Sequence, residues 1–253
     1  MLSLEEHLKR LKLPTIAGRY AELARDAERG RWTHERYLMA LAAAEVAHRD
    51  DRARQDRLKQ AGFPLDKTLA QFDFSARPQL RQGQVADLAK GDWIRGKETV
   101  ALLGPPGTGK THLAIALGIA ACEAGYRVKF QTASGLVNML TEAQGELRMS
   151  RQLNQLSKYD LLVLDELGYL PFSAQGAQLL FQVLADRYER GSVLFTSNLP
   201  FSRWTEVFGD QALTAALLDR LAHRVHVLEM TGTSYRFKER MARDTEKNQE
   251  NEE

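Results

Sequence analysis

The sequence predicts an α/β fold in which helices cover a parallel sheet of five strands. Five short apolar runs lie between Glu98 and Met230, and the intervals between them are long enough for helical crossovers. Their hydrophobicity is continuous rather than alternating, as expected of parallel strands buried on both faces. A helical periodicity precedes them from Ser3 to about Gly62. The five predicted strands are 99–103, 127–130, 161–164, 192–195 and 225–228.

The composition is that of a soluble globular protein. The chain has 253 residues, of which 43% are hydrophobic and 27% charged, and 35 basic against 33 acidic side chains give a formal charge of +2. No apolar run reaches the ~20 residues of a membrane helix, and the amino terminus lacks a secretory pattern. We therefore expect a cytoplasmic protein without a membrane partner. Its one cysteine, Cys122, excludes an internal disulfide and is expected in the core.

The amino-terminal helices carry start and stop signals. Ser3 and Glu6 fit a capping box, Pro14 breaks or restarts the helix, and Thr33 can cap a longer helix that ends near Gly62. The longer helix contains a run of basic residues that has two possible explanations. It can form ion pairs on a solvent-exposed helix face, or it can contact the phosphates of a nucleic acid. The run comprises Arg49, Arg52, Arg54, Arg57 and Lys59, interleaved with Asp50, Asp51 and Asp56.

Four segments follow from these changes of pattern. We expect a helical amino-terminal domain over 1–64, a linker with a lead-in helix over 65–97, the α/β core over 98–240, and a disordered acidic tail over 241–253. Partner or DNA interaction is assigned to the first segment.

A phosphate-binding loop is the strongest motif. Residues 104–111 read Gly-Pro-Pro-Gly-Thr-Gly-Lys-Thr, between a predicted strand and a predicted helix, so backbone N–H groups converge where a β-phosphate would lie. Lys110 would reach the β- and γ-phosphates, and the Thr111 hydroxyl would bind magnesium. A chance match occurs in roughly one chain of this length in a hundred. The predicted nucleotide-binding residues are Gly104, Pro105, Pro106, Gly107, Thr108, Gly109, Lys110, Thr111 and His112.

Two polar strand ends complete the predicted site. Asp165 ends the third predicted strand and would order the water shell of the magnesium ion. Glu166 is placed as a general base for water, which favours hydrolysis over transfer to a hydroxyl. If the fourth strand inserts beside the loop strand, Asn198 orients that water; the alternative is a turn asparagine before Pro200.

In this order of motifs the chain resembles the AAA+ ATPases, and among them the IstB-like transposition helpers, with the DnaC-type helicase loaders as near relatives. The similarity covers most of the chain. It rests on Phe72-Asp73-Phe74, the loop continued by His112-Leu113, Asp165-Glu166-Leu167-Gly168-Tyr169, and Thr196-Ser197-Asn198-Leu199-Pro200.

The resemblance implies ATP and Mg²⁺ as cofactors and an AAA+ P-loop core. It implies an arginine finger at Arg220, with Arg224 as competitor and a surface ion pair of Arg220 with Asp219 or Glu206 as the ordinary alternative. A second nucleotide-sensing arginine would correspond to Arg236. That residue normally lies on a helical lid, and because only 23 residues follow Met230 the lid is expected to be vestigial.

The resemblance also places DNA contacts between the second and third strands. That segment has a helical sequence pattern and contains Arg148, Arg151 and Lys158. We predict that these three side chains contact the phosphate backbone of DNA without reading bases. A solvent-exposed helix face explains them equally well. The implied function is an ATPase that oligomerises on duplex target DNA, remodels it and recruits the transposase of the same mobile element. The alternatives are a replicative helicase loader and, more remotely, a monomeric P-loop metabolite kinase.

Overall fold

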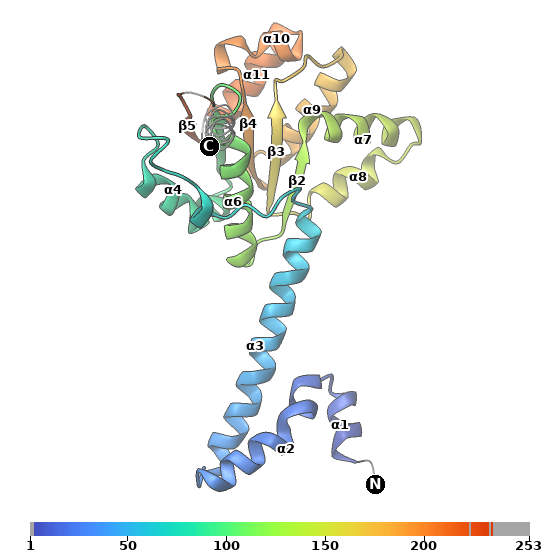
Figure 1. The fold of residues 1–253 in the computed structure, drawn as a ribbon. Coiled ribbons are helices and arrows are strands. Elements are labelled where there is room, and N and C mark those ends of the chain that lie inside the picture. The colour runs from blue at the N-terminus through green and yellow to red at the C-terminus, as the bar shows by residue number, and fades with distance from the viewer. Residues whose placement is uncertain (1–2, 223, 233, 235–253) are drawn as a thin grey trace, which may run out of the picture. The chain divides into compact units, whose positions relative to one another are not determined.

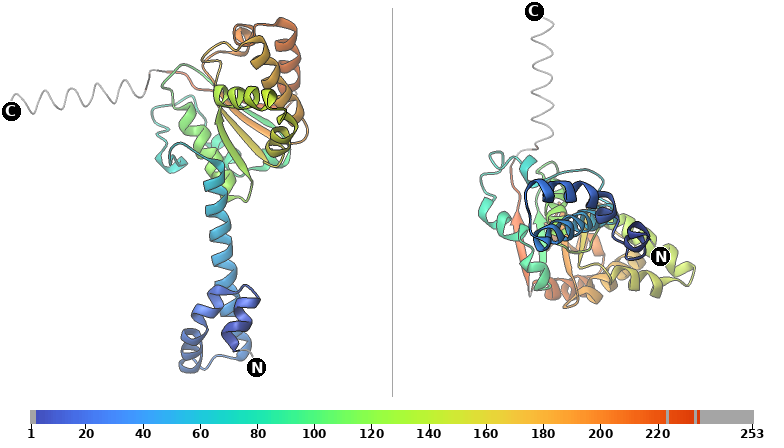
Figure 2. Two further views of the ribbon diagram at one scale, coloured as in Figure 1. Left: turned by 90° about the vertical axis from the view of Figure 1, so that its right-hand side faces the viewer. Right: turned by 90° about the horizontal axis from the view of Figure 1, so that it is seen from below.

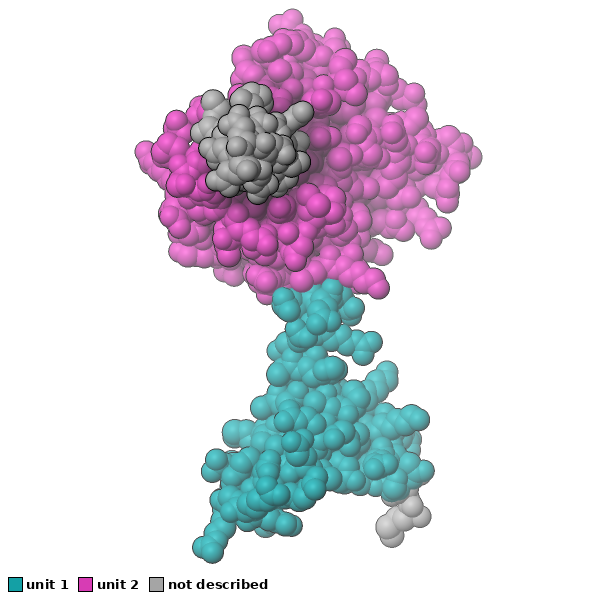
Figure 3. All heavy atoms as spheres, viewed as in Figure 1, with its two compact units in different colours: residues 1–56 teal, residues 57–253 magenta. Residues whose placement is uncertain are grey.

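The computed structural model describes residues 3–222, 224–232 and 234. The chain forms two compact units, residues 1–56 and residues 57–253 (Figure 3). Among the described residues, no helix combines the length and the apolar character needed to traverse a bilayer. The functional division of the chain at residues 64, 97 and 240 remains a prediction.

Unit 1 is helical, as predicted. It contains α1 (Leu4–Arg10), α2 (Pro14–Arg29) and most of α3 (His34–Ala61). The capping box of Ser3 and Glu6 is confirmed, Pro14 opens α2, and the Thr33 hydroxyl accepts from Arg36 N at 3.2 Å. Of the three leucines in and directly after α1, Leu8 is buried, whereas Leu4 and Leu11 are exposed.

The basic run of α3 contains ion pairs. Arg49 lies 3.1 Å from Glu45, and Arg54 lies 3.2 Å from Asp51. In unit 2, Arg57 donates to the Cys122 carbonyl at 2.8 Å. The arrangement therefore fits the explanation from ion pairs.

Unit 2 contains the predicted sheet, and all of its strand pairs are parallel. The strand order is β2-β3-β4-β1-β5, so β4 lies between β1 and β3 as the predicted role of Asn198 requires. Figure 1 shows β2, β3 and β4 side by side. The strands are β1 (Thr99–Leu103), β2 (Val128–Thr132), β3 (Leu161–Leu167), β4 (Ser192–Ser197) and β5 (Val225–Glu229).

Helices cover both faces of the sheet (Figure 2). One core cluster joins α6 to α4, α5 and the segment around Phe72, and the other lies beneath α7 to α11. The remaining elements are η1 (Leu69–Gln71), α4 (Gln82–Ala89), α5 (Asp92–Arg95), α6 (Lys110–Glu123), α7 (Ala133–Gly145), α8 (Met149–Leu156), α9 (Ala174–Arg187), η2 (Phe201–Arg203), α10 (Thr205–Phe208) and α11 (Gln211–Ala222).

Burial follows strand position in the sheet. Every residue of β4 is buried, including the polar Ser192, Thr196 and Ser197, as expected of a central strand that helices cover on both faces. The expectation of two covered faces is wrong for edge strand β5, where Val227 is 37% exposed. Cys122 lies in the core as predicted, and burial raises the pKa of its thiol to about 11. This thiol therefore stays protonated at neutral pH.

Candidate nucleotide-binding site

The phosphate loop joins β1 to α6, in the predicted setting. Gly104, Gly107 and Gly109 have φ values of +150°, +77° and +93°, which side-chain-bearing residues rarely adopt. A Cβ on Gly104 would also lie 2.1 Å from the Met230 carbonyl oxygen. The loop can therefore pass this close to β5 and expose its backbone only with glycine at these positions.

Lys110 opens α6 and is buried against the loop. Its Nζ donates to the carbonyl oxygens of Gly104 at 2.6 Å and Pro105 at 2.7 Å. The Thr108 hydroxyl donates to the Pro105 carbonyl at 2.9 Å, which ties the two halves of the loop together. The ammonium group, the loop and the first turn of a 14-residue helix thus concentrate positive charge and N–H donors at one point, where phosphate oxygens can bind.

Arg77 supports this loop, and the sequence analysis missed it. It is 4% exposed, and its Nε and Nη2 atoms donate to the carbonyls of Thr108 at 2.8 Å and Gly107 at 3.3 Å. In a trans peptide the N–H points opposite to the carbonyl. Holding these two carbonyls therefore turns the next N–H groups, those of Thr108 and Gly109, to the other side. The only feature of the sequence analysis close to Arg77 was the Phe72-Asp73-Phe74 motif, and it gave Arg77 no role.

A carboxylate lies beside the start of α6. Asp165 Oδ1 accepts from the Thr111 hydroxyl at 3.0 Å and from the Thr196 hydroxyl at 2.6 Å, and Asp165 is only 5% exposed. Thr196 also accepts from Glu166 N at 2.9 Å. Sequence reasoning quoted Thr196 without assigning it a role; the structure makes it the link between β4 and the two acidic residues.

A bulge in β3 separates the two acidic side chains. Leu164 pairs with Phe195 and Leu167 with Ser197, so β3 contains one residue more than β4 at this point. Glu166 has a φ of +63° and is the only exposed residue of β3. A left-handed backbone at a non-glycine residue costs roughly 1–2 kcal/mol. The bulge and the left-handed backbone turn Glu166 out of the sheet, while Asp165 stays buried next to Thr111.

Asn198 follows β4 at the same sheet edge. The carbonyl of the preceding residue, Ser197, accepts from Gly104 N at 3.1 Å, which anchors the end of β4 to the loop. Asn198 Oδ1 is buried and has no hydrogen-bond partner among the described residues. It lies close to Gly168, two residues beyond Glu166: a Cβ placed on this glycine would be 3.6 Å from Asn198 Oδ1. The structure therefore places Asn198 near both the loop and the acidic pair.

The side chain of His112 faces the lead-in segment. Its Nε2 lies 3.0 Å from the Thr68 carbonyl oxygen, and its ring packs edge-on against Phe72 with centroids 5.2 Å apart. Phe72 in turn contacts Phe74. A direct contact of His112 with a nucleotide remains a prediction.

Arg220 lies apart from this site in the same chain. Its guanidinium stacks over the Phe181 ring at 4.9 Å, and its Nη1 is buried with no partner among the described residues. The ordinary alternative, an ion pair with Asp219 or Glu206, is not found among the described residues, and Glu206 pairs with Arg203 instead. The competing candidate, Arg224, contacts Gly96 and lies beside the start of β1. The phosphate loop follows the other, carboxyl-terminal end of this strand. Arg220 lines a small cavity together with Thr99 and Arg224, at the amino-terminal end of β1. Neither arginine therefore lies near the phosphate loop of its own chain.

The remaining predicted residues do not form one cluster. Arg236, and with it any lid, lies outside the described residues. Arg148 directly precedes α8, makes no side-chain capping bond and pairs with Glu146. Arg151 is exposed on the first turn, and Lys158 lies beyond the other end of the helix.

The donor set fits a magnesium nucleotide. Mg²⁺ prefers oxygen ligands and usually binds through one or two protein groups together with phosphates and water. Thr111 and Asp165 offer a hydroxyl and a carboxylate within 3.0 Å of each other at the first turn of α6. Lys110 and the loop amides would hold the phosphates.

The chain matches a known family of ATP-binding proteins over most of its length. Residues 6–243 match the family described as IstB-like ATP binding protein. The chain is 43% identical over 240 residues to an insertion sequence IS21 ATP-binding protein of Pseudomonas aeruginosa, covering 95% of this chain and 91% of the relative. It is 38% identical over 247 residues to the insertion sequence IS5376 ATP-binding protein of Geobacillus stearothermophilus, covering 97% and 98%.

Solved structures share the fold at lower identity. AMPPCP-bound DnaA from Aquifex aeolicus matches with a TM-score of 0.58 and 22% identity, over 70% of this chain and 54% of that one. A DnaI crystal structure matches with a TM-score of 0.55 and 19% identity, over 70% and 94%. The α/β fold is thus that of AAA+ P-loop ATPases, as predicted. With the loop, the acidic pair and the family match in agreement, the chain belongs to the IstB-like ATP-binding proteins of insertion sequences.

Proposed function

We propose that this protein hydrolyses ATP with Mg²⁺ and uses the nucleotide to control its assembly on duplex DNA, where it remodels the target and recruits the transposase of its mobile element. The observation that carries the proposal is the cluster of Thr111, Asp165 and Thr196 beside the loop, with Glu166 turned outward from the same bulge. Hydrolysis requires groups that position the metal ion and a separate carboxylate that accepts a proton from water. Thr111 with Asp165 would serve the first purpose and Glu166 the second.

Each residue has a distinct role in the proposed hydrolysis. Bound Mg²⁺ would neutralise charge on the β- and γ-phosphates. Lys110 binds the same phosphates, and Asp165 with Thr111 positions the metal. Glu166 accepts a proton from the attacking water, and the unpartnered amide oxygen of Asn198 orients that water.

Assembly would complete the site. Arg220 lies at the amino-terminal end of the strands, whereas the phosphate loop lies at their carboxyl-terminal end. Arg220 could therefore contact a γ-phosphate only in the site of a neighbouring copy of the chain. A guanidinium supplied in this way stabilises the charge that develops during phosphoryl transfer. Hydrolysis would then depend on oligomerisation, and loss of the γ-phosphate would favour disassembly.

The DNA and transposase partners are supported by the relatives, which are ATP-binding proteins of insertion sequences. Arg148, Arg151 and Lys158 remain the predicted contacts to the phosphate backbone. A replicative helicase loader is the alternative, because the proposed catalytic residues would be the same in both. A monomeric metabolite kinase is less well supported, since Glu166 suits activation of water.

Sedimentation tests the proposal. The wild-type protein is measured with duplex DNA, Mg²⁺ and either ADP or a non-hydrolysable ATP analogue, and Lys110→Ala serves as the control that removes phosphate binding. We expect large assemblies only for wild type with the analogue. Equal, monomeric sedimentation in all mixtures would contradict the proposal. Capture of purified transposase rather than replicative helicase by the assembled protein distinguishes the helper from the loader.

A further inference from the structure

A groove of about 450 Å³ lies in unit 2 beside edge strand β2, away from the phosphate loop. It is lined by β2 and the residue before it, by α8 and the turn between α8 and β3, and by one residue each from the end of α3 (Gln60) and from α7 (Met139). Three cations and four glutamines contribute to the lining, together with Tyr159, and no carboxylate does so among the described residues. The cations are Arg127, Lys129 and Lys158.

The charge of this groove is only partly compensated. Arg127 lies 3.4 Å from Asp160, and among the residues that the structure describes this is the only acidic contact of the three cations. Within the described part of the chain, no carboxylate lies within 4.0 Å of the ammonium groups of Lys129 or Lys158. Lys129 is also half-buried on the strand. Two amines held against one groove without counter-charges favour an anionic ligand.

An unsatisfied amide faces the same groove. Gln131 Oε1 is buried and has no hydrogen-bond partner among the described residues, while its Nε2 makes only a long contact of 3.9 Å to the sulfur of Met139. A buried acceptor without a donor destabilises the protein, because it has lost its hydrogen bonds to water without a replacement. A ligand that brings a hydrogen-bond donor into the groove would recover part of the lost free energy.

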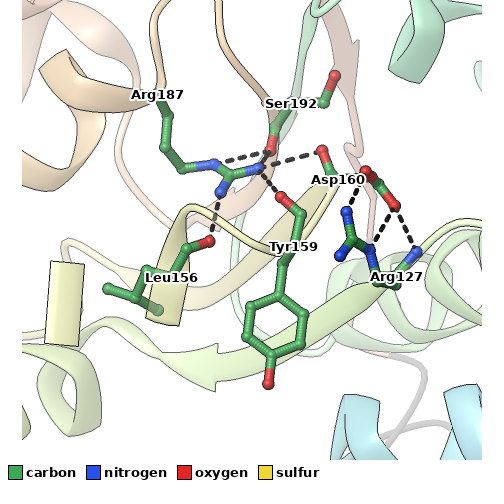
Figure 4. Close-up of polar contacts among 6 residues, drawn as sticks. All are labelled: Arg127, Leu156, Tyr159, Asp160, Arg187 and Ser192. Atoms are coloured by element: carbon green, nitrogen blue, oxygen red, sulfur yellow. Dashed lines mark hydrogen bonds and ion pairs between the residues drawn. The ribbon is translucent and has the colours of Figure 1, made fainter. Parts of the chain in front are cut away.

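The wall of the groove is fixed in place. Arg187 is 5% exposed and donates to the carbonyls of Leu156, Tyr159, Asp160 and Ser192, at 2.9–3.2 Å (Figure 4). These contacts join the end of α8 and the start of β3 to the start of β4. In Figure 4 the Tyr159 ring points away from the Arg187 guanidinium, while the Tyr159 carbonyl faces it. The groove is therefore preorganised rather than formed on binding.

We propose that this groove binds a nucleic-acid strand. Lys129, Lys158 and Arg127 would contact successive phosphates, and a base or sugar would lie against Tyr159 and the glutamine amides. A basic groove beside an aromatic ring and amide side chains is the pattern of strand binding, whereas an acidic peptide would not use the ring. The inference rests on the proposed DNA function and extends it, because it moves the main contact from Arg148 and Arg151 on α8 to the β2 edge.

The test compares two double variants that remove equal charge. Lys129→Gln with Lys158→Gln alters the groove, and Arg148→Gln with Arg151→Gln alters the start of α8. Affinity for a fluorescent duplex and for a single-stranded oligonucleotide is measured by anisotropy at several salt concentrations. Because each phosphate contact contributes about 0.9 to the salt slope on duplex and about 0.7 on single strands, the groove variant should lower the slope by roughly 1.4–1.8.

At 0.1 M salt the same change weakens binding by roughly 20- to 60-fold. The α8 variant should change the slope by less than half as much. Tyr159→Leu should weaken the single-stranded complex severalfold and leave the slope unaltered, since it removes stacking but no charge. ATP affinity and the thermal midpoint of each variant confirm that the fold is intact.

Three results would overturn the inference. The first is an unchanged slope in the groove variant while wild type binds DNA, which leaves the proposed function standing. The second is binding of a polyglutamate peptide, but of neither oligonucleotide, that depends on Lys129 and Lys158. The third is wild-type protein that assembles with ATP but has no affinity for either oligonucleotide, which removes the DNA step of the proposed function as well.

Discussion

The Thr196 hydroxyl donates to Asp165 Oδ1 at 2.6 Å and at the same time accepts from the Glu166 backbone N–H at 2.9 Å. One side chain of β4 therefore fixes both acidic residues of β3. The contact also spans the bulge, where the backbone of β3 departs from regular pairing. Loss of this hydroxyl should disturb the positions of two functional carboxylates without removing either.

We expect Thr196→Val to lower the ATPase kcat roughly 10- to 100-fold, because it leaves the Glu166 N–H without a partner and loosens a group that orients the metal ligand. Nucleotide affinity should change little, since Lys110 and the loop are untouched. Thr196→Ser retains the hydroxyl and should keep most of the activity. Steady-state hydrolysis and calorimetric ATP binding measure the two effects, and equal loss in both variants would argue against the hydroxyl.

Glu166→Gln should slow hydrolysis roughly 10²- to 10⁴-fold and leave ATP binding intact, because the amide cannot accept a proton from water. The ATP-bound assembly should then persist. Single-turnover hydrolysis and sedimentation with ATP report these two results. Normal turnover in this variant would remove Glu166 as the base.

Arg220→Ala should retain ATP affinity and lose the assembly-dependent part of hydrolysis, by about 10³-fold or more. Arg224→Ala is the matched control, since Arg224 lies on the same edge of the sheet and should affect the rate less. Mixing Arg220→Ala with Glu166→Gln subunits tests action between copies: the first supplies an intact base and the second an intact arginine. Activity above that of either variant alone is expected, and its absence would count against Arg220.

Arg187→Met should destabilise the fold by about 3 kcal/mol or more, because the carbonyls that the guanidinium binds would lose their donors in the interior. Arg190→Ala removes a nearby exposed arginine and should change the free energy of unfolding by less than about 0.5 kcal/mol. Urea unfolding followed by circular dichroism measures both. Similar midpoints for wild type and Arg187→Met would show that the buried contacts contribute little.

The sequence determined much of the site because its signals are local. The glycines of the loop, the strand before it and the helix after it lie within one short stretch, and the backbone conformation of that stretch needs those residue types. The same holds for the helix caps at Ser3 and Thr33, and for the apolar runs of the five strands. Asp165 and Glu166 were found because a strand ends in acidic residues at a fixed place relative to the loop.

Tertiary structure alone decided which distant residues meet. Thr196 reaches Asp165 only because β4 inserts between β1 and β3 in one register, and Arg77 reaches the loop from a segment about 30 residues away. The β2 groove likewise joins cations from a strand and from a helix end, and Arg220 is separated from its own loop by the length of the sheet. A short stretch of sequence predicts the conformation of its own backbone. Contacts across the sheet depend instead on strand order, register and a one-residue bulge, and no short stretch of sequence encodes these.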